Sequence, residues 1–120
     1  MTEYDPQNIF ARILRGEIPH KPVYEDDEIL AFHDVNPAAT VHVLVIPKGP
    51  YVSFDDFVQH TPHDRMARFF QRVQKIAAEL GIDQTGYRLI TNHGVHASQT
   101  VPHFHVHLLG GRSLGALLSH

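Results

Sequence analysis

Three histidines alternate with apolar residues near the C-terminal end of the chain, in the run His103-Phe104-His105-Val106-His107. If this run is a strand, successive side chains point to opposite faces, so the three imidazoles project to one side about 6.5–7 Å apart. Phe104, Val106 and Leu108 then point to the other side and anchor the strand in the core. The spacing therefore predicts three imidazoles on one face of a strand whose other face is buried.

One chemistry open to such a cluster is nucleophilic attack on phosphorus. A neutral imidazole has a reference pKa near 6.5, so it is largely unprotonated at pH 7 and carries a free lone pair. It needs an orienting partner on its other nitrogen, a donor for the leaving group and donors for the phosphoryl oxygens. The flanking histidines could supply the first two, and the polar segment Ala97-Ser98-Gln99-Thr100 the third.

A metal site is the main alternative interpretation. Histidines at positions i and i+2 occur in zinc sites borne by strands, but such sites usually add ligands from another element. The candidates are His42, His93 and His96, and nothing in the sequence fixes them at ligand distance. Three solvated surface histidines are a further interpretation. Alternation alone leaves the nucleophile and the metal site open.

Periodicity predicts the elements that must position these residues. A helix is expected after Asp5-Pro6, with Asp5 as its cap and Gly16 as its stop, and a longer amphipathic helix over 61–81. Apolar and β-branched runs predict strands over 23–24, 28–34, 41–46, 87–92 and 103–109, with 49–60 and 93–100 as connections. This order favours an antiparallel α+β domain over a βαβ one.

Composition limits the class of protein. The 120 residues fit one domain over 1–120, with a core at about 8–112 and a C-terminal tail at 113–120. Cysteine is absent, which excludes disulfides and thiolate metal sites. The formal charge of −3 does not suggest a nucleic-acid surface. Without a long apolar run or a signal peptide, no membrane association is expected and the cytoplasm is the expected location.

Several segments, in order, resemble the histidine triad (HIT) family. The run His103 to Leu109 is similar to its signature, in which three histidines alternate with apolar residues. The other similar segments are Glu25-Asp26-Asp27, Ala31-Phe32-His33-Asp34, His42-Val43-Leu44-Val45-Ile46-Pro47-Lys48, Tyr87-Arg88-Leu89-Ile90-Thr91-Asn92 and Leu109-Gly110-Gly111-Arg112. The resemblance covers roughly residues 8–120 and implies a HIT-like fold, an antiparallel sheet of about five strands with two main helices.

The resemblance is closest to the nucleoside phosphoramidase branch, in which Gly-Gly-Arg follows the triad, as it does at 110–112 here. It implies a homodimer that hydrolyses adenosine or guanosine phosphoramidates, releases the nucleoside monophosphate and an amine, and uses no cofactor and no metal. The binding partner it implies is therefore a purine nucleotide.

The resemblance also implies roles for individual residues. His105 would attack the α-phosphorus and form a nucleotidyl-histidine, while His107 would handle phosphate contact and proton transfer. His103 would orient its neighbours through hydrogen bonds, and His42 would join the cluster from the adjacent strand. Phe10, Ile13 and Ile18 would form an apolar pocket for the base, and Asp34 with Val35 would hold the ribose. The phosphate would be held by Asn92, Ser98, Gln99 and Thr100.

The loop before the triad departs from the phosphoramidase pattern. That branch usually has two glycines there, where this chain has Ala97-Ser98 followed by Gln99-Thr100-Val101-Pro102. Only glycine enters the left-handed backbone region freely, so the change bears on how closely the backbone approaches a phosphate. A Gln-Thr-Val segment also occurs in the dinucleoside polyphosphate hydrolases of the superfamily. That activity and a non-catalytic nucleotide-binding role are the alternatives.

Overall fold

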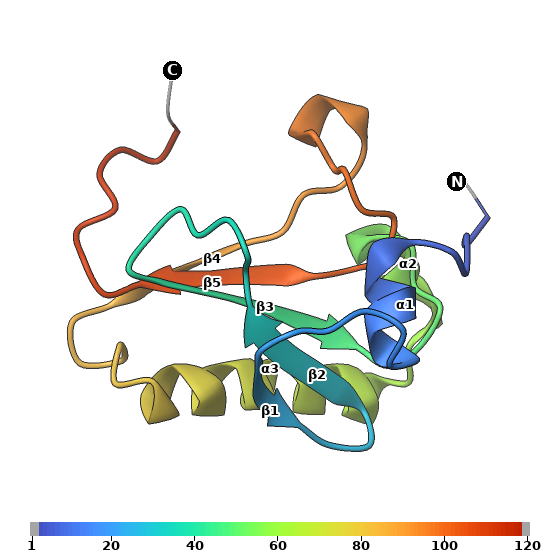
Figure 1. Ribbon diagram of the computed structural model, residues 1–120, viewed down its shortest axis with the longest axis horizontal. Coiled ribbons are helices and arrows are strands. Elements are labelled where there is room, and N and C mark those ends of the chain that lie inside the picture. Colours follow the sequence, from blue (N-terminus) through green and yellow to red (C-terminus); the bar gives the residue numbers. More distant parts are fainter. Residues whose placement is uncertain (1–2, 119–120) are drawn as a thin grey trace.

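A five-stranded antiparallel sheet lies at the centre of the computed structural model, which describes residues 3–118 (Figure 1). Its strand order is β1-β2-β3-β5-β4. The strands are β1 (Pro22–Glu25), β2 (Ile29–His33), β3 (Val41–Pro47), β4 (Tyr87–Ile90) and β5 (Val106–Gly110). This confirms the predicted α+β class and strand number. The predicted domain also included residues 1, 2, 119 and 120, which lie outside the described residues.

Helices cover both faces of the sheet. The helix α1 (Ile9–Leu14) packs on one face, and α2 (Phe54–His60) and α3 (His63–Glu79) pack on the other. Figure 1 shows α3 along the lower side of the sheet and α1 in front of its right-hand end. Within residues 3–118, no helix is both long and apolar enough to cross a membrane.

Alternation along the central strands divides the core into two clusters. In β3, Val43 and Val45 pack with α3, whereas Leu44 and Ile46 pack with Phe10 of α1. Because His42 is an even number of residues from Leu44, its side chain falls on the α1 face. The α1 face therefore carries both a smaller apolar cluster and the first of the buried histidines.

Two helix predictions need correction. The first helix begins at Ile9, and its cap is Asn8, whose side-chain oxygen accepts a hydrogen bond from Ala11 N at 2.9 Å. Asp5 instead accepts from Gln7 N in the preceding turn. The segment 49–60 was predicted as a connection only, but it contains α2, which forms because it buries Phe57 against the α3 side of the core.

The last strand begins at Val106, not at His103 as predicted. The pairing of β5 with β3 runs from Gly110 back to Val106, the first residue of β5, which lies opposite Val45. Before it the chain bonds elsewhere, since Phe104 N donates to Tyr51 O at 2.7 Å. Alternation nevertheless continues through this segment, with Phe104 in the α3 cluster and the ring of His105 4.9 Å from that of Phe10.

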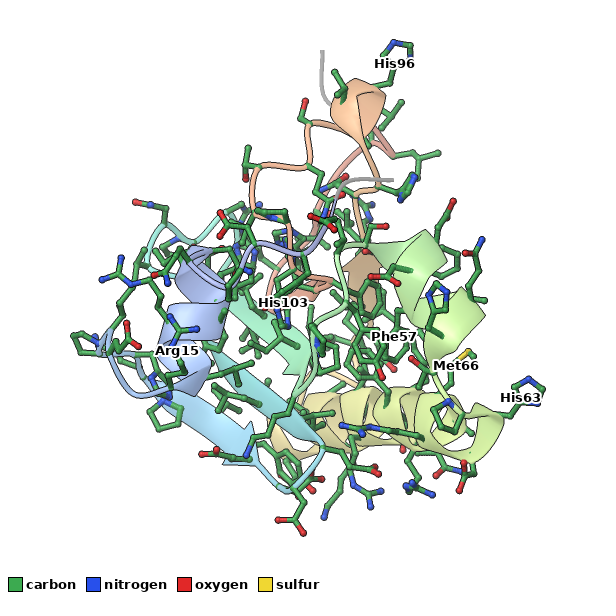
Figure 2. The ribbon with its side chains drawn as sticks, turned by 90° about the vertical axis from the view of Figure 1, so that its right-hand side faces the viewer. Arg15, Phe57, His63, Met66, His96 and His103 are labelled. Atoms are coloured by element: carbon green, nitrogen blue, oxygen red, sulfur yellow. The ribbon has the colours of Figure 1, made fainter. Side chains whose placement is uncertain are left out.

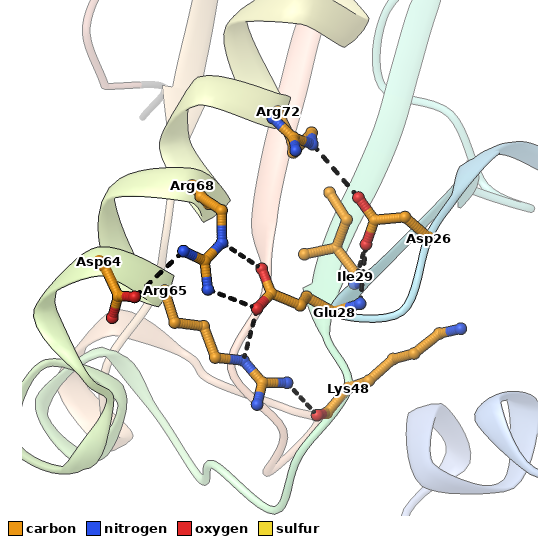
Figure 3. A network of polar contacts seen from close by, with 8 residues as sticks. All are labelled: Asp26, Glu28, Ile29, Lys48, Asp64, Arg65, Arg68 and Arg72. Atoms are coloured by element: carbon orange, nitrogen blue, oxygen red, sulfur yellow. Dashed lines mark hydrogen bonds and ion pairs between the residues drawn. The ribbon is translucent and has the colours of Figure 1, made fainter.

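A network of ion pairs joins the turn between β1 and β2 to α3 (Figure 3). Arg68 makes two parallel bonds to Glu28, from Nε to Oε1 at 2.9 Å and from Nη2 to Oε2 at 2.7 Å. Arg72 reaches Asp26 at 3.3 Å, and Arg65 donates to the carbonyl of Lys48 at 2.8 Å. The guanidinium of Arg68 holds the pKa of Glu28 below its ordinary value. Bidentate geometry makes this the strongest contact of the network.

We expect Glu28→Gln to lower the thermal unfolding midpoint by a few degrees at low ionic strength, because Gln cannot form the charged pair with Arg68. The loss should shrink at high salt, which screens exposed charges. Glu79→Gln is the matched control, since Glu79 has only a 3.9 Å contact with Lys75. Equal midpoints for the two variants at low salt would contradict the structural role given to Glu28.

Candidate active site

His105 is held in one tautomer by the main chain beside it. Its Nδ1 lies 2.7 Å from the carbonyl oxygen of His103. A carbonyl oxygen only accepts, so Nδ1 must carry the proton and donate it. In the neutral ring Nε2 then has an unprotonated lone pair, and His105 lines a pocket. This is the state that a histidine nucleophile requires.

The side chain of His103 is fully buried and has a hydrogen-bond partner on each ring nitrogen. Its Nε2 lies 2.9 Å from the carbonyl of Pro47, and its Nδ1 lies 2.7 Å from the hydroxyl of Tyr4. Because the Pro47 carbonyl only accepts, Nε2 donates and Nδ1 accepts from Tyr4. His103 thus contacts His105 through its main chain, while its ring contacts the end of β3 and the N-terminal segment. Figure 2 shows His103 inside the molecule.

His42 and His107 form a hydrogen-bonded pair across β3 and β5. The Nδ1 of His42 accepts from Ala38 N at 3.0 Å, so its proton is on Nε2. That nitrogen lies 2.9 Å from Nδ1 of His107, which must accept. The remaining proton of His107 is therefore on Nε2. The ring centroids of His105 and His107 lie 5.1 Å apart, and both residues line the pocket described below.

All four rings are held neutral by their surroundings. Burial is the largest cause, and it lowers the pKa of His42, of His105, of His103 to about 4 and of His107 to about 4. For His107 the neighbouring His105 and His42 lower the pKa further. The bond to the His103 carbonyl and the charge of Asp34 partly oppose the shift at His105. The cluster is therefore uncharged near neutral pH.

A pocket of about 470 Å³ brings together the predicted nucleotide-binding residues and two of the predicted catalytic histidines. Its volume lies in the usual range for small-ligand sites. The predicted residues on its wall are Phe10, Ile13, Ile18, Asp34, Val35, Asn92, Ser98, Gln99, Thr100, His105 and His107. His42 and His103 do not line it, because they lie behind His107 and His105 and contact those residues from the protein side.

The loop before the triad keeps a compact turn without its expected glycines. Ser98 has φ 58° and ψ 42°, which makes it the one non-glycine residue with positive φ in the described chain. The side-chain amide of Gln99 donates to the carbonyls of Val52 and Val101, and its oxygen accepts from Gly94 N. Gln99 thus supports the loop and joins it to Val52, and Ser98, Gln99 and Thr100 all lie on the pocket wall.

Asp34, His42 and His107 are the group of described residues whose donor atoms lie close enough to consider a metal ion, all within 4.8 Å of one another. The 2.9 Å between the two ring nitrogens fits a shared proton. Ligands on a tetrahedral zinc ion stand about 3.3 Å apart, so the pair would have to separate to bind one. His96, once a candidate ligand, lies at the tip of the loop, far from His103 (Figure 2).

The sequence reasoning missed several residues of the pocket wall. The side chains not predicted are Ile9, Pro19, His20, Phe32, His33, Asn36, Leu44 and Val101. Leu44 could have been found, since it follows His42 by two positions on a predicted strand. Phe32 is likewise in a predicted strand, two residues before Asp34. Tyr4 gives no comparable signal, because it precedes every predicted element.

Comparison with known proteins gives one consistent result. The HIT domain family matches residues 15–114. A 13.2 kDa HIT-like protein of Azospirillum brasilense is 50% identical over 97% of this chain and 95% of its own length. The purine nucleoside phosphoramidase of Escherichia coli K12 is 43% identical over 95% of each chain. A histidine triad protein from Clostridium difficile superposes with a TM-score of 0.83 at 43% identity, covering 93% of this chain and 96% of that one.

The depressed histidine pKa values predict that acid destabilises the fold. In the unfolded chain His103 and His107 regain pKa values near 6.5, whereas in the folded chain both are about 4. The unfolded state therefore binds more protons between these values, so stability is complete above about pH 6.5 and falls as the pH drops toward 4. For His103 alone the free energy of unfolding falls by up to about 3 kcal/mol, because each pKa unit of difference corresponds to about 1.36 kcal/mol.

Urea unfolding at several pH values in this window measures the effect. His107→Gln is the comparison variant, because it removes one of the two strongly shifted groups and should make the decline less steep. A free energy of unfolding that stays constant between about pH 7 and pH 4.5 would contradict the burial of neutral rings.

Proposed function

Because this chain belongs to the HIT domain family, we propose that it hydrolyses purine nucleoside phosphoramidates through a covalent nucleotidyl-histidine on His105. The observation that carries the proposal is the bond from His105 Nδ1 to the His103 carbonyl, which leaves the Nε2 lone pair free in a ring that lines the pocket. The similarity to the E. coli purine nucleoside phosphoramidase supports this substrate class.

The pocket wall offers complementary surfaces for the parts of a nucleotide. The apolar side chains of Phe10, Ile13 and Ile18 suit a purine base. Asp34 can accept hydrogen bonds from both ribose hydroxyls, a charge-assisted arrangement, with Val35 beside it. The loop residues Asn92, Ser98, Gln99 and Thr100 then flank the phosphate next to His105 and His107. We assign these roles as part of the same proposal.

In the first step Nε2 of His105 attacks the α-phosphorus and the phosphorus–nitrogen bond breaks. The electron pair of that bond goes to the leaving nitrogen, which takes up a proton and departs as the amine. We assign this proton, and contact with the phosphoryl oxygens, to Nε2–H of His107, whose other nitrogen is engaged by His42. Hydrogen bonds to the phosphoryl oxygens stabilise the charge that develops there.

In the second step water attacks the same phosphorus and the bond to His105 breaks. The proton released by the water returns to His107, and the lone pair of His105 is restored. The products are then a nucleoside monophosphate and an amine, and one water molecule is consumed. Splitting the reaction in this way replaces one difficult displacement by two easier ones.

Removal of the nucleophile gives the direct test. We expect His105→Ala to lower kcat for adenosine phosphoramidate by at least about a thousandfold, since no other described group has a free lone pair in this position. Intact-protein mass spectrometry during turnover of a slow substrate should show a nucleotidyl adduct on the wild type and none on the variant. Exposed His96 offers the control, because His96→Ala should keep both activity and adduct. Full activity of His105→Ala would refute the proposal.

The same assay separates the alternative substrates. Values of kcat/KM are compared for adenosine phosphoramidate and a diadenosine polyphosphate. A preference for the second would assign the chain to dinucleoside polyphosphate hydrolysis, with the same nucleophile. Calorimetric binding of adenosine monophosphate without turnover of either substrate would indicate a nucleotide-binding protein that is not an enzyme.

We further propose that the chain forms a homodimer through β4. This strand is at the edge of the sheet, where its outer backbone groups have no strand partner among residues 3–118. Leu89 and Ile90 on it are 45% and 36% exposed, although both are large and apolar. Edge strands with exposed apolar residues favour association with another chain. Pairing of two β4 strands would cover both the backbone edge and these side chains.

Sedimentation analysis should therefore give a mass near twice the 13.6 kDa of the chain. A lysine on an edge strand opposes pairing, so Leu89→Lys should shift the mass toward that of one chain. Val95→Lys is the matched control, since Val95 is 91% exposed on the loop before the triad. A wild-type protein that sediments as one chain would refute the dimer.

A further inference from the structure

The N-terminal segment reaches the histidine cluster through Tyr4. Its hydroxyl lies 2.7 Å from Nδ1 of His103, and the two rings meet edge to face with centroids 5.6 Å apart. Ninety-nine positions separate these residues in the sequence, so the contact exists only in the folded chain. His103 has no exposed surface, and its ring does not line the substrate pocket. Tyr4 therefore contacts the histidine cluster through His103 and does not line the pocket.

We propose that Tyr4 is a positioning residue that fixes His103 and, through the main chain of His103, the nucleophile His105. The inference rests on the proposed function for its kinetic readout. Its structural part, the effect of Tyr4 on the tautomers of two histidines, does not depend on which substrate the protein uses.

The two hydrogen bonds of the His103 ring fix the position of its proton. The carbonyl of Pro47 requires a donor, so Nε2 of His103 carries the ring proton. Nδ1 is then a buried acceptor, and the hydroxyl of Tyr4 is the donor that satisfies it. Without Tyr4 this nitrogen would lose its partner in an environment with no access to bulk water, which destabilises the observed tautomer and ring position.

The ring position matters because of what the main chain of His103 does. Its carbonyl accepts the Nδ1 proton of His105 at 2.7 Å, and this bond selects the tautomer with a free Nε2. The peptide between His103 and Phe104 is planar, so its N–H and its carbonyl move together. Phe104 N of this peptide donates to Tyr51 O at 2.7 Å, and the ring of His103 that precedes it is held by Tyr4 and Pro47.

Phe10 gives the arrangement its second contact surface. Its ring lies edge to face on His103, at 6.3 Å between centroids, and on His105, at 4.9 Å. A shift of His103 therefore also disturbs the packing that orients the ring of His105. Hydrogen bonding thus connects Tyr4 to the nucleophile through His103 alone, and ring packing connects them through His103 and Phe10.

Tyr4→Phe tests the proposal, since it keeps the ring and removes only the hydroxyl. A neutral hydrogen bond is worth about 1 kcal/mol, so we expect kcat for adenosine phosphoramidate to fall about three- to tenfold with KM nearly unchanged. Tyr24→Phe is the matched control. It removes a hydroxyl that bonds to Asp26 at 2.8 Å in the ion network, and it should leave kcat unchanged.

Nitrogen NMR of histidine-labelled protein without substrate measures the tautomers of the histidines, which a general loss of stability would not change. Tyr4→Phe should shift the Nδ1 signal of His103 and raise the fraction of His105 protonated at Nε2, whereas Tyr24→Phe should change neither. Histidine signals identical to wild type would overturn the proposal, as would a kcat within twofold of wild type in an active enzyme. A rise in KM alone would also overturn it, because that indicates substrate contact. If no substrate is turned over, the proposed function fails and the NMR result alone decides the role of Tyr4.

Discussion

The hydrogen bond from His105 Nδ1 to the carbonyl of His103 fixes the free lone pair of the histidine cluster on Nε2 of His105. Three imidazoles on one face are equally suited to metal binding and to nucleophilic attack until their protons are placed. A carbonyl acceptor places one of them, because it accepts only from a protonated Nδ1. Each of the other three rings is then assigned in the same way, from Pro47 for His103 and from Ala38 for His42 and His107.

Burial keeps the four rings neutral, because it makes their protonation costly in free energy. Four neutral rings next to one another would each gain a proton in water below about pH 6.5, but desolvation disfavours the charged form. The layer between the sheet and α3 is apolar, whereas the layer on the α1 face also contains the buried histidines. Phe104 illustrates the division, since it stacks on Phe57 at 4.5 Å while the residues on either side of it contact Phe10.

The sequence predicted those features that depend on local periodicity. Alternation around His105 correctly gave the two faces of its segment, and helical spacing gave the long helix α3. Features that depend on distant partners were not predictable. The group that orients His105 is a main-chain carbonyl, which cannot be inferred from residue types. The partners of the His103 ring lie 56 and 99 positions away in the sequence. The strand start at Val106 was missed for the same reason, since pairing with β3 sets it.

The loop before the triad keeps its backbone turn although it has Ala97-Ser98 in place of two glycines. Ser98 adopts the left-handed conformation that a glycine would adopt freely, at a cost of roughly 1–2 kcal/mol. The side chain of Gln99 offsets this cost with two hydrogen bonds inside the loop, to Gly94 and Val101, and a third to the carbonyl of Val52 outside it. The turn is thus retained, but Ser98 adds a side chain to the pocket wall where glycine has none. The substitution therefore acts on the space and polarity of the pocket, and it leaves the bond between His105 and the carbonyl of His103 unchanged.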